Sequence, residues 1–253
     1  MVSMASHSAS VHGSVMNSAA GKVGTKWQGE LRLHDRWASW RGAVGDGVLH
    51  RHFAAQAIIA DRPIRVRDAQ DHLIEATCIL IDPLTPHRIE PGGEALLVYV
   101  EPGRSVDPEF EQLLRSMVAR TSPALVERHG GARFWTSWRT SALTAVGPID
   151  RRLTAALDYI EGALLSGPVP LHHAAATASL SPDRFRHLFA DQLGVPYKRY
   201  VLWRRLRLAA VELAAGRDVT TAAHAAGFSD SAHLARTIKT TFGVTAGQAL
   251  LPA

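Results

Sequence analysis

Four side chains in the N-terminal half have the types and spacing that could bind a ligand or a metal ion. His50 and His52 are separated by one residue, Gln56 follows four residues later, and His87 lies further along the chain. Alternate residues of a β-strand face the same side of a sheet, so the first two imidazoles could point into one interior. Neutral imidazole is also a common ligand of divalent metals. These four residues are the candidate binding site of this half.

A second set of candidate residues lies in the C-terminal half and could contact DNA. Residues 150–253 contain 12 Lys and Arg against 8 Asp and Glu, a net charge of +4, whereas residues 1–149 contain 16 against 15. A basic excess confined to one region is typical of a protein that binds a partner with phosphates. A mildly basic surface in contact with solvent would give the same net charge.

Common catalytic motifs are missing from the sequence. It contains no Gly-x-Ser-x-Gly elbow, no Gly-x-x-x-x-Gly-Lys-[Ser/Thr] phosphate loop and no Cys-x-x-Cys pair. Cys78 is the one cysteine; it excludes an internal disulfide, fits a reducing cytoplasm, and is best explained as a small buried strand residue. We therefore expect a cytoplasmic protein that is not an enzyme.

The elements that must position the N-terminal candidates have the pattern of strands. Residues 1–25 are rich in Ser, Ala and Gly and predict a flexible tail. Residues 26–104 consist of short apolar or alternating runs between turn residues, which predicts an antiparallel sandwich or small barrel. No run reaches the roughly 18 apolar residues of a membrane helix, so we expect no membrane partner.

Residues 105–149 predict a helical connector. One face of its first helix is apolar and could cover the barrel or join two chains. The residues of that face are Phe110, Leu113, Leu114, Met117 and Val118. We favour the covering role, and a homodimer stays an open alternative.

After Ile149 the period is helical throughout, and one segment occurs twice, at 171–195 and 219–244. Each copy predicts a short Ala-rich helix, a tight turn, and a capped second helix that ends at a glycine. The turn, cap and final glycine are Ser179, Ser181 and Gly194 in the first copy and Gly227, Ser229 and Gly243 in the second. Two copies of this pattern favour a pair of helix-turn-helix motifs.

The two copies are joined by a predicted helix from Tyr197 to Ala215. At about 1.5 Å per residue it is roughly 28 Å long, close to the roughly 34 Å between successive major-groove faces of B-DNA. Such a spacer could present two recognition helices to adjacent turns of one duplex. Its residues Arg204, Arg205 and Arg207 are interpreted as phosphate contacts.

Residues 150–253 resemble the DNA-binding domain of the AraC/XylS family of bacterial transcription regulators. The resemblance rests on "LSPDRFRHLFADQLGVPYKRYVLWRRLRLA" and "AAHAAGFSDSAHLARTIKTTFGVT". It implies that the exposed face of each second helix enters the major groove of promoter DNA, with RNA polymerase as a further partner. The implied DNA-binding residues are Asp183, Arg184, Arg186 and His187 in the first motif, and Ser231, Ala232, His233, Arg236 and the phosphate contact Lys239 in the second.

Three features depart from this family pattern or sit oddly in it. Ile238 stands where the family usually has Phe, and "TAGQAL" replaces the usual Thr-Pro followed by an aromatic-Arg ending. Both changes concern packing of the second motif more than its recognition surface. Asp183 would repel phosphate; it either accepts from a cytosine amino group or supports the helix N-terminus, and we favour the second role.

Residues 48–90 loosely resemble the cupin-like effector domains of AraC-type regulators. Cupin barrels place an H-x-H pair, a later His and usually a Glu around a divalent metal; Gln56 stands roughly in the place of that Glu and is a poorer ligand. Two interpretations stay open. In the first, His50, His52, Gln56 and His87 line a metal-free cavity for a small-molecule effector; in the second, they bind a metal. We expect the first, without a metal or cofactor.

Together these patterns predict a two-domain α+β protein. An N-terminal antiparallel cupin-like barrel (26–104) and a helical connector (105–149) precede an all-α domain with two helix-turn-helix motifs joined by a long helix (150–253). We expect a sequence-specific DNA-binding transcription regulator, activator or repressor, controlled by a small-molecule effector. The alternative is a metal-dependent cupin enzyme, of oxygenase or isomerase type, that carries a helical appendage.

Overall fold

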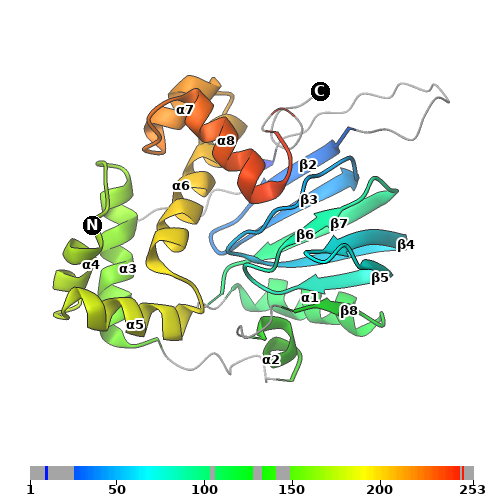
Figure 1. The fold of residues 1–253 in the computed structure, drawn as a ribbon, viewed down its shortest axis with the longest axis horizontal. Helices are drawn as coiled ribbons and strands as arrows, with labels where there is room; N and C mark the ends of the chain where they lie inside the picture. The colour runs from blue at the N-terminus through cyan, green and yellow to red at the C-terminus, as the bar shows by residue number, and fades with distance from the viewer. Residues whose placement is uncertain are drawn as a thin grey trace.

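The computed structural model has strands in its N-terminal half and helices in its C-terminal half, so the predicted two-part α+β organisation is confirmed (Figure 1). The described residues are 9–10, 26–102, 106–127, 133–140, 149–245 and 247. The predicted flexible tail, residues 1–25, therefore lies almost wholly outside them.

Eight strands form one sheet in the order β1, β2, β3, β7, β4, β5, β8, with β6 paired to β4. Their bounds are β1 Ala9–Ser10, β2 Gln28–Leu33, β3 Trp37–Ala43, β4 Ala55–Asp68, β5 Leu73–Ile81, β6 His87–Ile89, β7 Glu94–Val100 and β8 Ala124–Val126. All neighbours are antiparallel except β5 and β8. The path has two ends, so the described strands form an open sheet and not the closed barrel that we expected.

The two faces of the sheet are buried by different helices. Successive residues of β4 alternate between the faces, as the period of a strand requires: Ala57 belongs to one apolar cluster and Ile58 to the other. Helices α1 (Pro108–Ala119) and α2 (Phe134–Thr140) pack against the first face, where Cys78 is fully buried as predicted. The covering role of α1 is thus confirmed, although Leu113 is 56% exposed.

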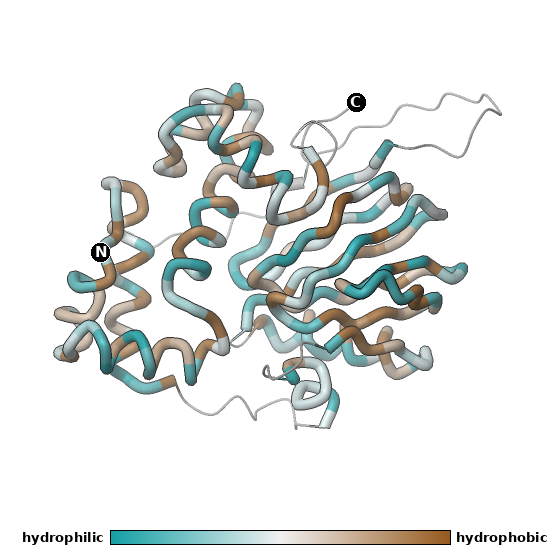
Figure 2. The backbone as a smooth tube through the Cα atoms, in the orientation of Figure 1, coloured by the Kyte–Doolittle hydropathy of each residue, from teal (hydrophilic) through white to brown (hydrophobic). Residues whose placement is uncertain are grey.

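The described part of the C-terminal half consists of helices α3 to α8, which lie beside the sheet (Figure 1). They are α3 Arg151–Leu164, α4 Leu171–Thr177, α5 Pro182–Leu193, α6 Tyr197–Ala214, α7 Val219–Ala225 and α8 Ser231–Phe242. Along α3 and α6, hydrophobic and hydrophilic residues alternate around the helix (Figure 2). The predicted spacer helix is confirmed to within one residue at its C-terminal end.

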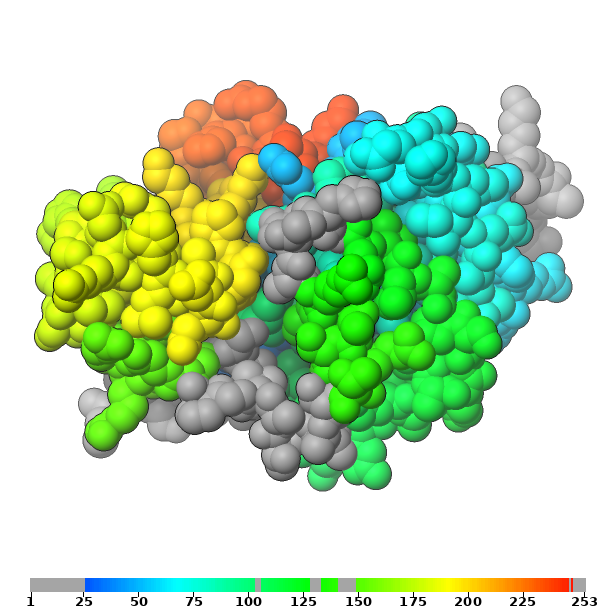
Figure 3. All heavy atoms as spheres, turned by 60° about the horizontal axis from the view of Figure 1, so that its bottom comes forward, coloured from blue at the N-terminus to red at the C-terminus, as the bar shows by residue number. Residues whose placement is uncertain are grey.

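The helical half lies directly against the second face of the sheet, and the two parts share apolar clusters. Phe53 and Leu84 from the N-terminal half pack with α3 to α6, and Phe242 and Val244 pack with the sheet. The space-filling view shows the two lobes in contact (Figure 3). Among the described helices, none has both the length and the apolar character needed to cross a membrane.

Candidate nucleic-acid interface and effector cavity

Two helix pairs have the same turn geometry. After α4, Ser179 has a φ of 53° and Leu180 N donates to Ala175 O at 2.9 Å. After α7, Gly227 has a φ of 74° and Phe228 N donates to Ala223 O, also at 2.9 Å. A left-handed residue followed by this backbone bond ends a helix abruptly and lets the next helix cross it closely. The sequence repeat therefore corresponds to a repeat in structure.

The second helix of each pair begins at a side-chain cap and ends at a left-handed glycine. Ser181 caps α5, as predicted, and accepts from Arg184 N at 3.4 Å. For α8 the prediction of Ser229 is wrong by one residue: Asp230 is the cap, and its Oδ1 accepts from His233 N at 2.6 Å. Asp230 takes this position because a carboxylate is favourable at the positive end of the helix dipole.

The predicted DNA-binding residues lie on the outer faces of α5 and α8. Phe185, Phe189 and Leu234 point inward and are fully buried. Eight of the nine predicted residues are exposed, and Ser231 is half-buried; the exposed ones are Asp183, Arg184, Arg186, His187, Ala232, His233, Arg236 and Lys239. Asp183 lies in the first turn of α5 and pairs with Arg186 at 2.8 Å. Both recognition faces are therefore open to solvent.

The spacer helix α6 does not offer all of its arginines to phosphate. Arg204 Nη1 donates to both carboxylate oxygens of Glu101, at 3.2 and 3.1 Å, and Arg207 Nε lies 3.1 Å from Glu101 Oε1. Trp203 Nε1 donates to the same oxygen at 2.8 Å. Our interpretation of Arg204 and Arg207 as phosphate contacts is therefore wrong here, because a buried carboxylate at the end of β7 binds them.

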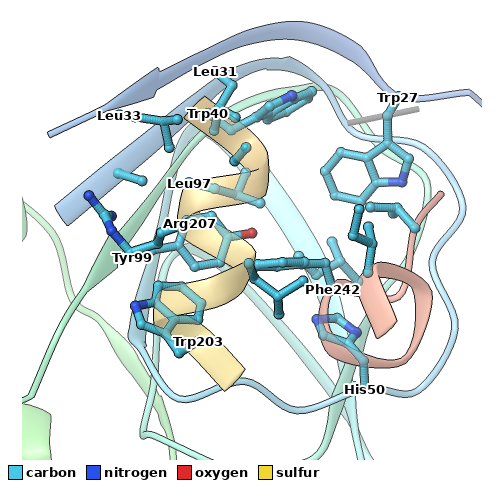
Figure 4. Close-up of a pocket in the computed structure, with 16 residues that line it drawn as sticks. Trp27, Leu31, Leu33, Trp40, His50, Leu97, Tyr99, Trp203, Arg207 and Phe242 are labelled. Carbon is cyan, nitrogen blue, oxygen red and sulfur yellow. The ribbon is translucent and has the colours of Figure 1, made fainter. Parts of the chain in front are cut away.

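A cavity lies between the sheet and the helices of the C-terminal half (Figure 4). It leaves about 80 Å³ for the centres of water-sized molecules, several times the roughly 10–15 Å³ that one water requires. Its walls are apolar side chains of β2, β3, β7, α6 and α8, including Leu97, Leu206 and Phe242. Polar side chains among them are His50, Tyr99 and Arg207, and Trp40 contributes its Nε1, which has no hydrogen-bond partner among the described residues.

Only one of the four predicted pocket residues lines this cavity. That residue is His50; His52 lines a smaller hollow, and Gln56 and His87 are fully buried. His50 and His52 do not share a strand, because β4 starts at Ala55 and His50 forms an isolated bridge with His87. Sequence analysis missed Trp40 and Glu101, since neither stands in a motif.

A comparison with protein families decides the nature of the C-terminal half. The model of a helix-turn-helix domain, of the AraC type, matches residues 174–250. Residues 174–250 are an AraC-type helix-turn-helix domain. This AraC-type domain supports a DNA-binding transcription regulator, as the sequence predicted.

Two solved structures of ToxT have a similar fold, and a third structure matches a smaller part of this chain. Unsaturated-fatty-acid-bound ToxT from Vibrio cholerae is 6% identical with a TM-score of 0.53, over 87% of this chain and all of that one. ToxT bound to (E)-4-(8-methylnaphthalen-1-yl)but-3-enoic acid is 7% identical with a TM-score of 0.51, over 83% and 97%. A regulator from Chromobacterium violaceum is 26% identical with a TM-score of 0.35, over 37% and 84%. No curated protein matches.

Beside the AraC-type domain, the structure brings three predicted histidines together. One ring nitrogen each from His50, His52 and His87 lies within 4.8 Å of the others. Their Nδ1 atoms lie 2.8 to 2.9 Å from the carbonyl oxygens of nearby residues, which are Val48, Ala54 and Thr85. A carbonyl only accepts, so each Nδ1 carries the proton and each Nε2 keeps a free lone pair.

Burial holds these rings in the neutral form. It lowers the pKa of His50 to about 3 and that of His52 to about 4, and it lowers the pKa of His87 well below its usual value. An imidazolium would lose its hydration at this depth, and its neighbours would repel it. The AraC-type domain closes the site, since the His52 ring lies 6.2 Å from that of Phe242 at the end of α8.

The histidine cluster fits a transition metal as well as a metal-free pocket. Neutral imidazole nitrogens with fixed tautomers are ligands for zinc and related ions. His87 Nε2 is buried and has no partner among the described residues, so one lone pair of the cluster is unsatisfied. A buried polar atom in this state needs a water, an ion or a ligand to explain it.

Proposed function

We propose that this protein is a sequence-specific transcription regulator whose two helix-turn-helix motifs bind adjacent segments of the major groove. The observation that carries this proposal is the structural repeat, in which α5 and α8 each present an exposed basic face after an equivalent turn. Helix α6 joins the two motifs, because its first half packs in the apolar cluster of the first motif and its second half in that of the second. Arginines would add salt-dependent phosphate contacts, and the recognition faces would select the sequence.

We further propose domain limits at residues 26–104, 105–149 and 150–253, with RNA polymerase and a second copy of the chain as partners of the bound form. Residue 150 is supported as a limit because all the described strands lie before it, only helices are described after it, and Asp150 caps α3.

The effector that the cavity favours is an apolar molecule with one anionic or hydrogen-bond-accepting group. The cavity walls would bind the apolar part. The Arg207 N–H groups not used by Glu101 and the Trp40 Nε1, which is unpartnered among the described residues, would bind the acceptor. ToxT, a structural neighbour, is seen with an unsaturated fatty acid and with a naphthalenyl butenoic acid. A long-chain unsaturated carboxylic acid is therefore our candidate effector, and His50 would line its site.

Gel shift of the full chain tests the DNA-binding proposal. We expect retardation of the DNA upstream of its own gene at concentrations that leave a shuffled sequence of the same composition free. Equal affinity for both duplexes would contradict sequence-specific binding.

The effector proposal is tested by adding oleic acid, with oleyl alcohol as the matched control. The acid should raise the melting temperature and change the DNA affinity, and the alcohol should do less because it lacks the carboxylate for Arg207. An identical response to both, or no response to either, would contradict an acidic effector.

A further inference from the structure

We propose that His50, His52, His87 and Gln56 bind one divalent transition-metal ion, and that this ion is linked to the docking of α8 on the sheet. The proposal concerns a second ligand of the protein, bound by a cluster that shares His50 with the effector cavity. It does not depend on DNA binding.

The donor set is already oriented for a cation. All three Nδ1 atoms bond to backbone carbonyls, so the Nε2 atoms are the ring nitrogens left to coordinate an ion, and one ring nitrogen of each residue lies within 4.8 Å of the others. This arrangement is what a metal site requires of its outer contacts, because the carbonyl fixes both the tautomer and the ring direction. The unpartnered Nε2 of His87 is the strongest sign that an occupant belongs there.

Gln56 adds a second sign. Its Oε1 lies 3.3 Å from His52 Nε2, and with the proton of His52 on Nδ1 these are two acceptors facing each other. Gln56 Nε2 donates to the Tyr99 hydroxyl at 3.1 Å, which holds the amide oxygen toward the ring. Two acceptors so close repel unless a cation lies between them or the amide turns over.

A water molecule satisfies this site poorly. It supplies only two hydrogens, whereas the site presents three imidazole lone pairs and an amide oxygen. A cation interacts favourably with all four. With no carboxylate and no thiolate in the set, imidazole favours zinc, nickel, cobalt or copper over magnesium and calcium.

Binding requires a small contraction of the site. Tetrahedral ligands on bonds of about 2.0–2.1 Å lie roughly 3.3 Å apart, whereas the three ring nitrogens lie within 4.8 Å of one another. The His52–Gln56 pair already has this separation. At least one of the three rings therefore has to move inward when the ion binds, and a movement of His50 would be passed to its neighbours.

That movement is connected to the second recognition helix. His50 is bonded to Val48 O, and Val48 N donates to Gly243 O, the left-handed cap of α8, at 3.0 Å. The contact is so close that a Cβ on Gly243 would lie 2.5 Å from His50 Nδ1. Figure 4 shows the His50 ring beside this end of α8. Metal binding should therefore stabilise the segment on which α8 docks.

The first experiment measures metal binding by untagged, chelator-treated full-length protein. We expect one equivalent of Zn²⁺ in calorimetry, and Co²⁺ should give the visible spectrum of a four-coordinate site. His87→Asn should abolish binding, with circular dichroism and melting to check the fold, and His52→Gln is the second variant. The exposed neighbours His172 and His173 provide the control.

The control decides between the buried cluster and a surface pair. Binding that survives in the double variant His172→Ala/His173→Ala and is lost in folded His87→Asn or His52→Gln supports the site. No stoichiometric binding by the wild type, or loss only in the surface variant, overturns it.

The second experiment tests the linkage to α8 by its reciprocity. If Zn²⁺ stabilises the docked helix, loosening that helix with Phe242→Ala must weaken Zn²⁺ binding, by at least about fivefold for a coupling of typical size. Thr240→Ala, on the exposed face of α8, should leave the affinity unchanged. In the wild type, Zn²⁺ should also slow amide hydrogen exchange at the end of α8. Unchanged affinity and unchanged exchange would overturn the linkage, even if the metal binds.

Discussion

Trp203 Nε1 in α6 donates a hydrogen bond of 2.8 Å to the carboxylate of Glu101, which is only 2% exposed at the end of β7. The same carboxylate binds the next residue, Arg204, and also Arg207, one helical turn along. Arg207 also donates to the backbone oxygen of His34. Helix α6 joins the two helix-turn-helix motifs, so this one acidic side chain ties both motifs to the sheet.

Replacing that acid should loosen the contact between the two halves. Glu101→Gln leaves buried arginines without a full countercharge, a change that costs about 3–5 kcal/mol in buried pairs. Denaturant unfolding and hydrogen exchange along α6 would measure the loss. Glu212→Gln breaks only a surface pair with Arg217 at 3.9 Å and should change stability by less than about 1 kcal/mol. Equal effects of the two variants would show that Glu101 does not anchor α6.

The two helix-turn-helix turns should respond unequally to a substitution of the left-handed residue. Gly227→Ala forces a Cβ into a φ of 74° and should destabilise the protein by about 1–2 kcal/mol. Ser179 already adopts a φ of 53°, and Ser179→Gly should be close to neutral, because relief of strain offsets the added entropy of the unfolded chain. Thermal melts of both variants check this. A tolerated alanine at 227 would argue against an obligatory left-handed turn.

The recognition helix α8 should contain both specific and unspecific DNA contacts. Arg236→Ala should weaken binding to the cognate promoter by about 1–3 kcal/mol if the arginine contacts a base. Lys239→Ala, one turn further along, should weaken binding to all DNA sequences alike. It should also lower the slope of log affinity against log salt concentration by about one. Fluorescence anisotropy on cognate and shuffled duplexes separates these outcomes. An equal loss on both duplexes would make Arg236 a phosphate contact.

The cap of α8 gives a pH-dependent contribution to stability. The bond from His233 N holds the pKa of Asp230 below its usual value. A depressed carboxyl pKa stabilises the fold above the unfolded pKa of about 3.9, and this stabilisation is lost as the pH falls through the folded pKa. Asp230→Ala should therefore be less stable than wild type at neutral pH, with the difference shrinking below about pH 4.

Asp230→Asn is the matched variant, because asparagine caps helices well without titrating. Its advantage over alanine should persist in acid. A wild-type advantage that stays constant from neutral pH to acid would show that the charge of Asp230 contributes nothing to the cap.

Filling the cavity should separate effector binding from DNA binding. Ala210 lines the cavity from α6, whereas its neighbour Val211 is 47% exposed. Ala210→Phe should abolish the thermal shift caused by oleic acid, at an overpacking cost of about 1–3 kcal/mol. Val211→Phe should retain the shift. If both variants respond like the wild type, the effector binds elsewhere.

The sequence by itself determined the helices, their turns and the identity of the C-terminal half. Hydrophobic periodicity, helix caps and glycines are local signals, so α3, α5, α6 and α8 were predictable nearly to the residue. The equivalence of Ser179 and Gly227 was evident from aligning the two sequence segments. Exposure of the recognition faces followed from the same periodicity. Ser229 failed as a cap because two neighbouring side chains can both serve, and the helix begins one residue later, with the Asp230 carboxylate at its positive end.

Only the tertiary structure decided how the halves meet. The path of the sheet depends on pairings between strands far apart in sequence, so an open sheet and a closed barrel have the same local pattern. The role of Arg207 depends on Glu101, 106 positions away, and an arginine has the same sequence signature whether it faces phosphate or a buried carboxylate. His50 and His87 were named as partners in advance, but their proton positions follow from carbonyls that only the folded backbone supplies.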